Sequence, residues 1–382
     1  MNKTELSETE GKTYYFNDRG IPKGCQLCLK GLKTVLFLNG ICQHPPHCRW
    51  YCPISKTRKD KNHTFANEIK IFSMEELIDE IRITQSRGMS VTGGEPLAKG
   101  NINETIGYIS YVKSEIGSDF HVHLYTNGLT FTEEIAEKLA QCGLNEIRFN
   151  TPPDIISNIR FALNKGMSVG AEVPVIPKKQ HIKNIERLIL YLDKIGADFV
   201  NLNEFEMCYP NSEALKERGF ILEDGTIASV SQSNADALNL IKKMQSRVKI
   251  MLHYCPIISK DYYQLKNRYI RRADSIKLPH ETITSEGLLL WAEVRGNRAD
   301  IALLKTMLIQ KMKIPIQFIQ EDQEILKISY EYAIKDDFIS LIEKKKLKCH
   351  IMESIPLRGE YTQITEKTPI RVFKRELNDY EN

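Results

Sequence analysis

The sequence lacks the features that place a protein in a membrane or direct it across one. No run approaches the roughly 18 apolar residues that a membrane-spanning helix needs. Residues 1–11 are polar and acidic, without the apolar stretch of a secretory signal peptide. We therefore expect a cytoplasmic protein with no membrane partner.

Charge of one sign is also scarce. The net charge is only +4 over 382 residues, which argues against a dedicated nucleic-acid surface but leaves RNA open as a substrate. The sequence contains neither a repeat of solenoid length nor a low-complexity tract. Apolar residues at 42% and charged residues at 27% are typical of a globular protein, and the length suffices for a large α/β domain with a smaller one.

Cysteine, in contrast, is abundant and clustered. Five of the nine cysteines fall between Cys25 and Cys52, and Cys42, Cys48 and Cys52 lie within one short loop. In a reducing cytoplasm such clusters indicate metal binding or catalysis rather than disulfides. Thiolates select zinc, copper(I) or an iron–sulfur cluster, and the residues alone leave these three open.

Apolar runs and helical patterns alternate along residues 33–255. The strand candidates are residues 34–38, 89–92, 121–126, 145–149, 168–175, 199–205 and 248–254. Helical patterns separate most of them, including residues 73–87, 102–116, 132–142, 154–166, 182–195 and 234–244. This alternation predicts an α/β fold with a parallel sheet, and so many units in series favour a barrel or partial barrel.

The rest of the chain is organised differently. Residues 1–32 are predicted to be an N-terminal segment with a Cys-x-x-Cys knuckle, followed by the partial barrel over 33–275. Mixed strand and helix patterns over 276–365 predict a small α+β domain, and 366–382 are predicted to be a charged tail.

Polar and thiol side chains gather where the predicted barrel strands end. They are the cysteine loop, Gly93-Gly94-Glu95, Thr126-Asn127, Glu204 and Cys255. In a βα barrel the C-terminal ends of the strands form the active-site face, so we expect one shared site. The net-basic stretch Lys260 to Arg272 follows the last of these strands. It is either an anion or substrate contact at the mouth of the barrel or a solvated helix face.

These motifs, in this order, resemble the radical S-adenosylmethionine (radical SAM) enzymes. The resemblance rests on the cysteine loop with an aromatic residue before its last cysteine, and on Gly93-Gly94-Glu95-Pro96 after the next strand. Leu124 to Gly128 and Glu172 to Pro177 resemble segments of the branch related to pyruvate formate-lyase activating enzymes. The loop spacing here is Cys-x5-Cys-x3-Cys, whereas the family usually has Cys-x3-Cys-x2-Cys. The insert carries His44 and His47, which we interpret as loop residues rather than ligands.

The resemblance implies a partial (β/α) barrel of the radical SAM type and a set of cofactor contacts. Cys42, Cys48 and Cys52 would each bind one iron of a 4Fe-4S cluster, and S-adenosylmethionine would chelate the fourth iron. Gly93 and Gly94 would let the backbone approach the methionyl amino group, and Glu95 would accept from it. Tyr51 would lie against the adenine. The residues that would reach the ribose or the methionyl carboxylate are Asn127, Arg148 and Glu172.

The implied activity is reductive cleavage of S-adenosylmethionine to a 5′-deoxyadenosyl radical, which abstracts hydrogen from an unidentified small molecule, peptide, protein or RNA. Such an oxidoreductase needs a reductant such as ferredoxin or flavodoxin. A second iron or zinc could bind cysteines outside the loop, namely Cys25, Cys28, Cys255 and Cys208, although Cys208 and Cys255 could equally be buried packing residues. The alternative for the whole chain is a non-catalytic zinc- or iron–sulfur-binding interaction protein.

Overall fold

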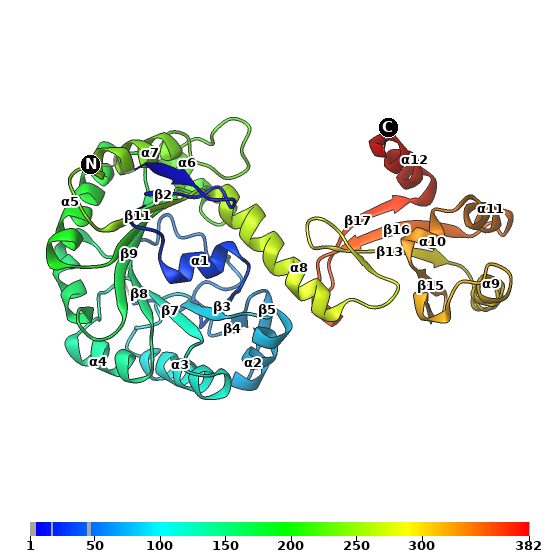
Figure 1. The fold of residues 1–382 in the computed structure, drawn as a ribbon, viewed down its shortest axis with the longest axis horizontal. Helices are drawn as coiled ribbons and strands as arrows, with labels where there is room; N and C mark the ends of the chain where they lie inside the picture. Colours follow the sequence, from blue (N-terminus) through cyan, green and yellow to red (C-terminus); the bar gives the residue numbers. More distant parts are fainter. Residues whose placement is uncertain (1–4, 17, 44–46, 382) are drawn as a thin grey trace. The chain divides into compact units, whose positions relative to one another are not determined.

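The computed structural model describes residues 5–16, 18–43 and 47–381 of the chain. It divides into two compact units, Met1–Leu265 and Lys266–Asn382, each with its own hydrophobic core (Figure 1). The boundary predicted at residue 275 lies just beyond this division, within helix α8 (Leu265–Ile276).

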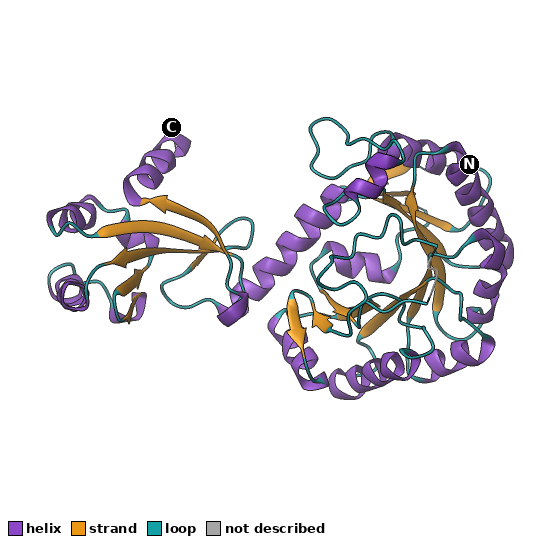
Figure 2. Cartoon of the chain, turned by 180° about the vertical axis from the view of Figure 1, so that it is seen from behind, coloured by secondary structure: helices purple, strands orange, loops and turns teal. Residues whose placement is uncertain are grey.

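The first unit is built on a sheet whose central strands are all parallel and neighbour one another in chain order. They are β3 (Lys33–Phe37), β6 (Gly88–Thr92), β7 (His121–Thr126), β8 (Glu146–Phe149), β9 (Ser168–Val175), β10 (Phe199–Glu204) and β11 (Met251–Cys255). The helices lie around the outside of the curved sheet (Figures 1 and 2). They are α2 (Met74–Ile83), α3 (Ile102–Ile116), α4 (Glu133–Gln141), α5 (Lys179–Ile195) and α7 (Ser233–Met244). Parallel strands need such crossovers, and every successive strand therefore ends at the same rim.

Short antiparallel strands extend this sheet at both edges. β1 (Leu6–Glu8) and β2 (Tyr14–Phe16) continue it beyond β11, while β4 (Thr64–Ala66) and β5 (Ile69–Ile71) continue it beyond β3. Within the described part of the chain, no strand pairing joins β1 to β5, so the barrel is partial. The predicted α/β partial barrel with a small C-terminal α+β domain is confirmed.

Helix α1 (Lys23–Leu29) lies inside the curved sheet, at the end where the strands begin (Figure 1). The backbone amide of Gly24 donates to Glu146 Oε2 at 3.1 Å, and Leu27 touches Gly88, the first residue of β6. A Cβ on Gly24 would lie 2.6 Å from His123 Nδ1, so only glycine allows this close approach. The Cys-x-x-Cys segment therefore forms a helix rather than the predicted knuckle, with Gly24, Cys25 and Leu27 buried inside the barrel.

The segment predicted as a helix over residues 154–166 differs from expectation. It forms the 3₁₀ helix η1 (Pro153–Ala162), which begins at consecutive prolines rather than at a cap on Asp154. Pro152 precedes it with an extended backbone, as a residue before proline prefers.

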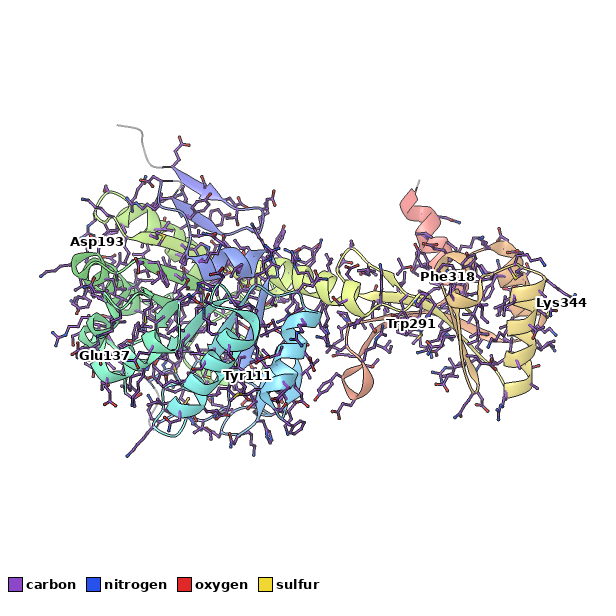
Figure 3. All side chains as sticks on the ribbon, turned by 60° about the horizontal axis from the view of Figure 1, so that its bottom comes forward. Tyr111, Glu137, Asp193, Trp291, Phe318 and Lys344 are labelled. Atoms are coloured by element: carbon purple, nitrogen blue, oxygen red, sulfur yellow. The ribbon has the colours of Figure 1, made fainter. Side chains whose placement is uncertain are left out.

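On the outer face of the unit, Tyr111 of α3 donates to Glu75 of α2 at 3.1 Å and links two neighbouring helices (Figure 3).

The second unit is an antiparallel sheet with helices. Its strands are β13 (Leu289–Arg295), β14 (Ile319–Asp322), β15 (Ile325–Ile328), β16 (Lys348–Ser354), β17 (Ile364–Pro369) and the short β12 (Thr282–Ile283). Its helices include α9 (Arg298–Gln310), α10 (Tyr330–Ala333), α11 (Asp336–Lys344) and α12 (Ile370–Glu381).

The predicted charged tail is ordered structure. β17 pairs with β16, and α12 packs Phe373 on the core while Lys374 and Arg371 bind acidic side chains of α11. Across residues 5–16, 18–43 and 47–381, no helix combines the length and apolar content that crossing a bilayer requires.

Candidate functional site

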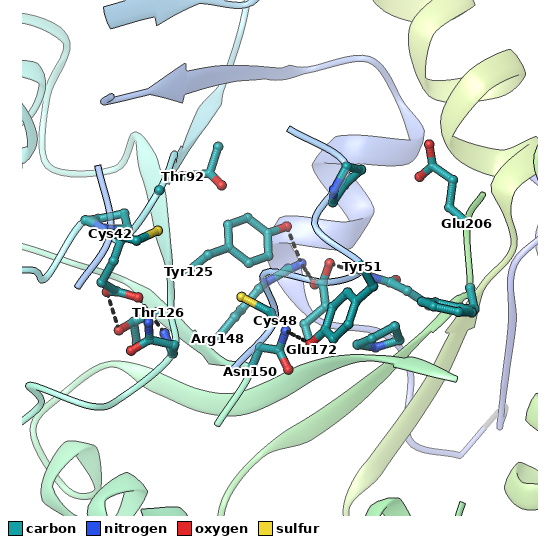
Figure 4. Close-up of a pocket in the computed structure, with 18 of the residues that line it drawn as sticks. Cys42, Cys48, Tyr51, Thr92, Tyr125, Thr126, Arg148, Asn150, Glu172 and Glu206 are labelled. Carbon is teal, nitrogen blue, oxygen red and sulfur yellow. Dashed lines mark hydrogen bonds and ion pairs between the residues drawn. The ribbon is translucent and has the colours of Figure 1, made fainter. Parts of the chain in front are cut away.

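A cavity of about 270 Å³ opens at the rim where the parallel strands end (Figure 4). Its lining comes from the cysteine loop after β3 and from the ends of β6 to β10. It includes Cys42, Cys48, Tyr51, Gly94, Glu95, Thr126, Asn127, Arg148, Asn150, Glu172, Asn203 and Glu204. Residues from distant parts of the sequence thus meet at one site, at the face expected for a βα barrel.

The three loop cysteines lie close enough to influence one another. Burial, with smaller contributions from Cys48, Glu95 and Cys52, raises the pKa of Cys42 to about 12. Burial also raises the pKa of Cys48 to about 11, with Cys52 contributing. Binding a metal as thiolates would therefore release protons from these groups.

The arrangement of these thiols fits a cluster better than a single ion. In the described part of the chain, no three His, Cys, Asp or Glu side chains are grouped to hold one metal ion. A cubane cluster does not need such a grouping, because each thiolate binds a different iron. Three thiols that share one electrostatic neighbourhood without converging on a point suit it.

Gly93 and Gly94 hold the β6 loop against the cysteine loop. Gly93 has φ +148° and its Cβ would lie 2.5 Å from the backbone oxygen of Asn39, while a Cβ on Gly94 would overlap the backbone of Ile41. The amides of Gly94 and Glu95 donate to Asn39 and Ile41 oxygens at 2.6 and 2.9 Å. The glycines are thus needed for packing between the two loops, whatever they also allow a ligand to do.

Replacing Gly94 by alanine should loosen the cysteine loop. We expect Gly94→Ala to lower the free energy of unfolding by about 1–3 kcal/mol, as overpacking does, and to reduce metal retention. Gly100→Ala is the matched control, because its Cβ would meet nothing within 4 Å. In a Trp291→Phe background, urea denaturation followed by Trp50 fluorescence measures the stability of both variants, and iron counting measures metal retention. Equal stabilities would contradict the packing role.

Glu95 is fixed by three donors beneath the rim. Its carboxylate accepts from Thr126 Oγ1 at 2.6 Å and from the backbone amide of Asn127 at 2.7 Å (Figure 4). It also accepts from the backbone amide of Leu97 at 3.0 Å. Burial raises the pKa of Glu95, and the three donors offset this only in part. A cationic donor from a ligand would favour the ionised form.

Asn127 and Tyr51 border the same cavity. Asn127 Oδ1 accepts from Gln43 Nε2 at 2.8 Å, which ties the end of β7 to the cysteine loop. The hydroxyl of Tyr51 accepts a hydrogen bond from the side-chain amide of Asn150 at 3.3 Å, and its ring packs edge-on against Phe205. On its other side Tyr51 lines a second cavity of about 390 Å³, which His47 also lines. His44 lies outside the described residues.

Arg148 and Glu172 lie deeper and form an ion pair with each other. Arg148 Nη1 contacts Glu172 Oε2 at 2.6 Å and Tyr125 Oη at 3.2 Å (Figure 4). Its Nε donates to Glu146 Oε1 at 2.6 Å. Burial alone would raise the pKa of Glu172, but Arg148 and two asparagine amides lower it to about 2. Their assignment to S-adenosylmethionine stays a prediction.

The cysteines outside the loop separate into two places. Cys25, Cys28 and Cys255 line a smaller cavity of about 100 Å³. It lies next to the 270 Å³ cavity at the strand ends, called the rim cavity below, with which it shares lining residues. Cys208 lies elsewhere: burial and Glu206 raise its pKa to about 11, with Cys52 of the loop contributing. The structure therefore does not bring all four candidates for a second metal together.

The sequence analysis did not single out several residues of the site. Asn150 lines the rim cavity, Asn201 lines the smaller one, and Tyr125 and Asn203 line both. Lys260, from the basic stretch that the sequence placed near the barrel mouth, also lines both. Asn201 and Asn203 alternate along β10, and Arg148 with Asn150 along the β8 segment, which places each pair on one face. That polar alternation in otherwise apolar strands was the signal available.

Three comparisons with known proteins bear on this site. The model of the radical SAM superfamily matches residues 43–198. A Methanocaldococcus jannaschii protein, provisionally named a glycyl-radical enzyme activating enzyme, is 38% identical over 283 residues, 71% of this chain and 72% of that protein. A GTP 3′,8-cyclase of Syntrophomonas wolfei is 32% identical over 99 residues, 25% of this chain and 29% of the cyclase. The solved methyltransferase TsrM from Kitasatospora setae covers 70% of this chain and 58% of its own at 12% identity and a TM-score of 0.36.

Proposed function

This chain belongs to the radical SAM superfamily and is an enzyme, and we propose that it cleaves S-adenosylmethionine reductively with a 4Fe-4S cluster held by Cys42, Cys48 and Cys52. The proposal rests on one observation above all. Cys42, Cys48 and Glu95 line the same cavity at the rim where the parallel strands end. The non-catalytic alternative has no comparable support.

Each residue has a distinct part in this proposal. When bound, the cluster would supply one electron to the sulfonium, giving methionine and a 5′-deoxyadenosyl radical that abstracts hydrogen from the substrate. Glu95 would accept from the methionyl amino group with the carboxylate that Thr126 and two amides already orient. Tyr51, Asn127, Arg148 and Glu172 would shape the rest of the pocket, whose buried walls keep water from the radical.

The electron needs a donor such as ferredoxin or flavodoxin. The name of the M. jannaschii relative makes a glycyl-radical protein one candidate substrate, alongside a small molecule, a peptide or RNA. A second iron or zinc would draw on Cys25, Cys28 and Cys255, which line one small cavity, while Cys208 lies apart from them.

Anaerobic reconstitution with iron and sulfide tests the proposal. We expect about four irons per chain with a brown absorption band, and release of 5′-deoxyadenosine when dithionite and S-adenosylmethionine are added. Iron and zinc are counted by mass spectrometry and the nucleoside by liquid chromatography. One or two zincs without colour, or iron without 5′-deoxyadenosine, would end it.

A further inference from the structure

The smaller cavity beneath the site is a candidate binding chamber of its own. Its volume of about 100 Å³ has room for several water molecules or a small polar group. It is lined by Cys25, Cys28, Lys33, His253, Cys255 and Gln264. It shares a wall with the rim cavity, and that wall is made by Tyr125, Arg148, Glu172, Asn203 and Lys260.

This chamber holds more positive than negative charge. Arg148 is balanced by Glu146 and Glu172, with which it forms buried ion pairs. Lys33 and Lys260 also line the chamber, and no hydrogen bond or ion pair to either ammonium is found within residues 5–16, 18–43 and 47–381. Burial opposes the charge on Lys33, but Cys28, Tyr125 and Glu172 outweigh it and raise the pKa of Lys33. A bound anion would give each ammonium the direct partner that it lacks among these residues.

The thiols of the chamber do not supply that anion. Burial raises the pKa of Cys25 and of Cys255 to about 12, so both stay neutral. Cys28 donates its S–H to Gln264 Oε1 at 2.6 Å, and Gln264 Nε2 in turn lies 3.6 Å from Cys255 Sγ. Cys25 and Cys255 therefore present neutral thiols to the two lysines.

His253 adds a requirement of the opposite kind. It is 1% exposed, and its Nε2 has no hydrogen-bond partner among the described residues. Its Nδ1 lies 3.2 Å from Asn201 Oδ1, and Asn201 uses its amide nitrogen to donate to Glu172, so Nδ1 carries the proton. Burial lowers the pKa of His253 to about 4, which leaves Nε2 as a lone pair that needs a donor.

We propose that the chamber binds the acid end of the substrate, with a carboxylate on Lys33 and Lys260 and a neighbouring O–H or N–H on His253. The ligand class is an α-hydroxy or α-amino acid. This inference rests on the proposed function for its meaning, since the shared wall would place the acid's carbon next to the S-adenosylmethionine cavity.

Binding of carbon-13-labelled glycolate and glycine, followed by NMR titration, tests the proposal directly. We expect one of them to bind more tightly than acetate, which lacks the donor for His253. Lys33→Met and Lys260→Met should each raise its Kd about tenfold or more, as loss of a hydrogen bond to a charged group does. Lys99→Met, at an exposed loop position, should change nothing. Lys260 is only partly buried, so Lys260→Met decides the matter if Lys33→Met does not fold.

Two further arms separate this proposal from the one on which it rests. Cys48→Ala should bind the acid as well as the unaltered protein does, whether or not the enzyme cleaves S-adenosylmethionine. Displacement of the acid by S-adenosylhomocysteine would indicate that the acid binds in the rim cavity and would overturn the inference. So would the absence of binding, or a Kd unchanged in both lysine variants.

Discussion

Cys48→Ala should abolish the release of 5′-deoxyadenosine while leaving the fold intact. The thiol of Cys48 lines the rim cavity and interacts electrostatically with Cys42 and Cys52. Its loss would leave the proposed cluster with two protein ligands. We expect the iron content after reconstitution to fall from about four per chain to near zero. The brown absorption band should be lost with it. Iron counting, the absorption spectrum and chromatography of the nucleoside measure the three effects together.

Cys142→Ala is the matched control for this experiment. Cys142 is a partly buried cysteine at the C-terminal cap of α4, and its thiol donates to the Leu139 oxygen of its own helix at 3.2 Å. It should keep the full iron content and activity. Retention of 5′-deoxyadenosine release by Cys48→Ala, or an equal loss in Cys142→Ala, would refute the assignment of the cluster ligands.

Arg148→Met should destabilise the first unit more than any surface substitution. Arg148 is the cation shared by Glu146 and Glu172, and all three side chains are nearly or fully buried. Removing it strands two carboxylates in the barrel, which typically costs about 3–5 kcal/mol of unfolding free energy. Both carboxylates, whose pKa values Arg148 holds near 2 against the effect of burial, would then take up protons more readily.

The measurement can be confined to the first unit. The chain has two tryptophans, so in a Trp291→Phe background the fluorescence of Trp50 reports on this unit alone during urea denaturation. Arg82→Met is the control, because Arg82 forms one exposed ion pair with Asp79 at 3.9 Å, of a kind that contributes about 0–1 kcal/mol. If the two variants differ by less than 1 kcal/mol, the buried network does not stabilise the barrel as we infer.

Much of the barrel could be predicted because its strands are apolar runs between clear helix signals. The bounds of α3, β7 and β9 coincide with the predicted ranges 102–116, 121–126 and 168–175. The common rim followed from topology, since parallel strands joined by helices all end on one side. The sequence therefore suffices to place Cys42, Cys48 and Glu95 together.

The interior of the barrel could not be predicted in the same way. A Cys-x-x-Cys pair fits a metal knuckle as well as a helix, and only the contacts of Gly24 and Leu27 with distant strands place α1 inside. Alternation along a strand shows that Arg148 faces inward. It does not show how deep the side chain lies or that two carboxylates already occupy it. Pairing with β16 likewise orders the charged residues 364–369, against their composition.

The position of helix α1 has a consequence for the order of events in turnover. Because it fills the barrel where the strands begin, we expect a molecule bound for the inner chamber to come through the rim, past Tyr51 and Glu95. S-adenosylmethionine, once bound at that rim, would block the path to the inner chamber. Turnover would then follow a compulsory sequence in which the acid enters first and, after reaction, leaves last.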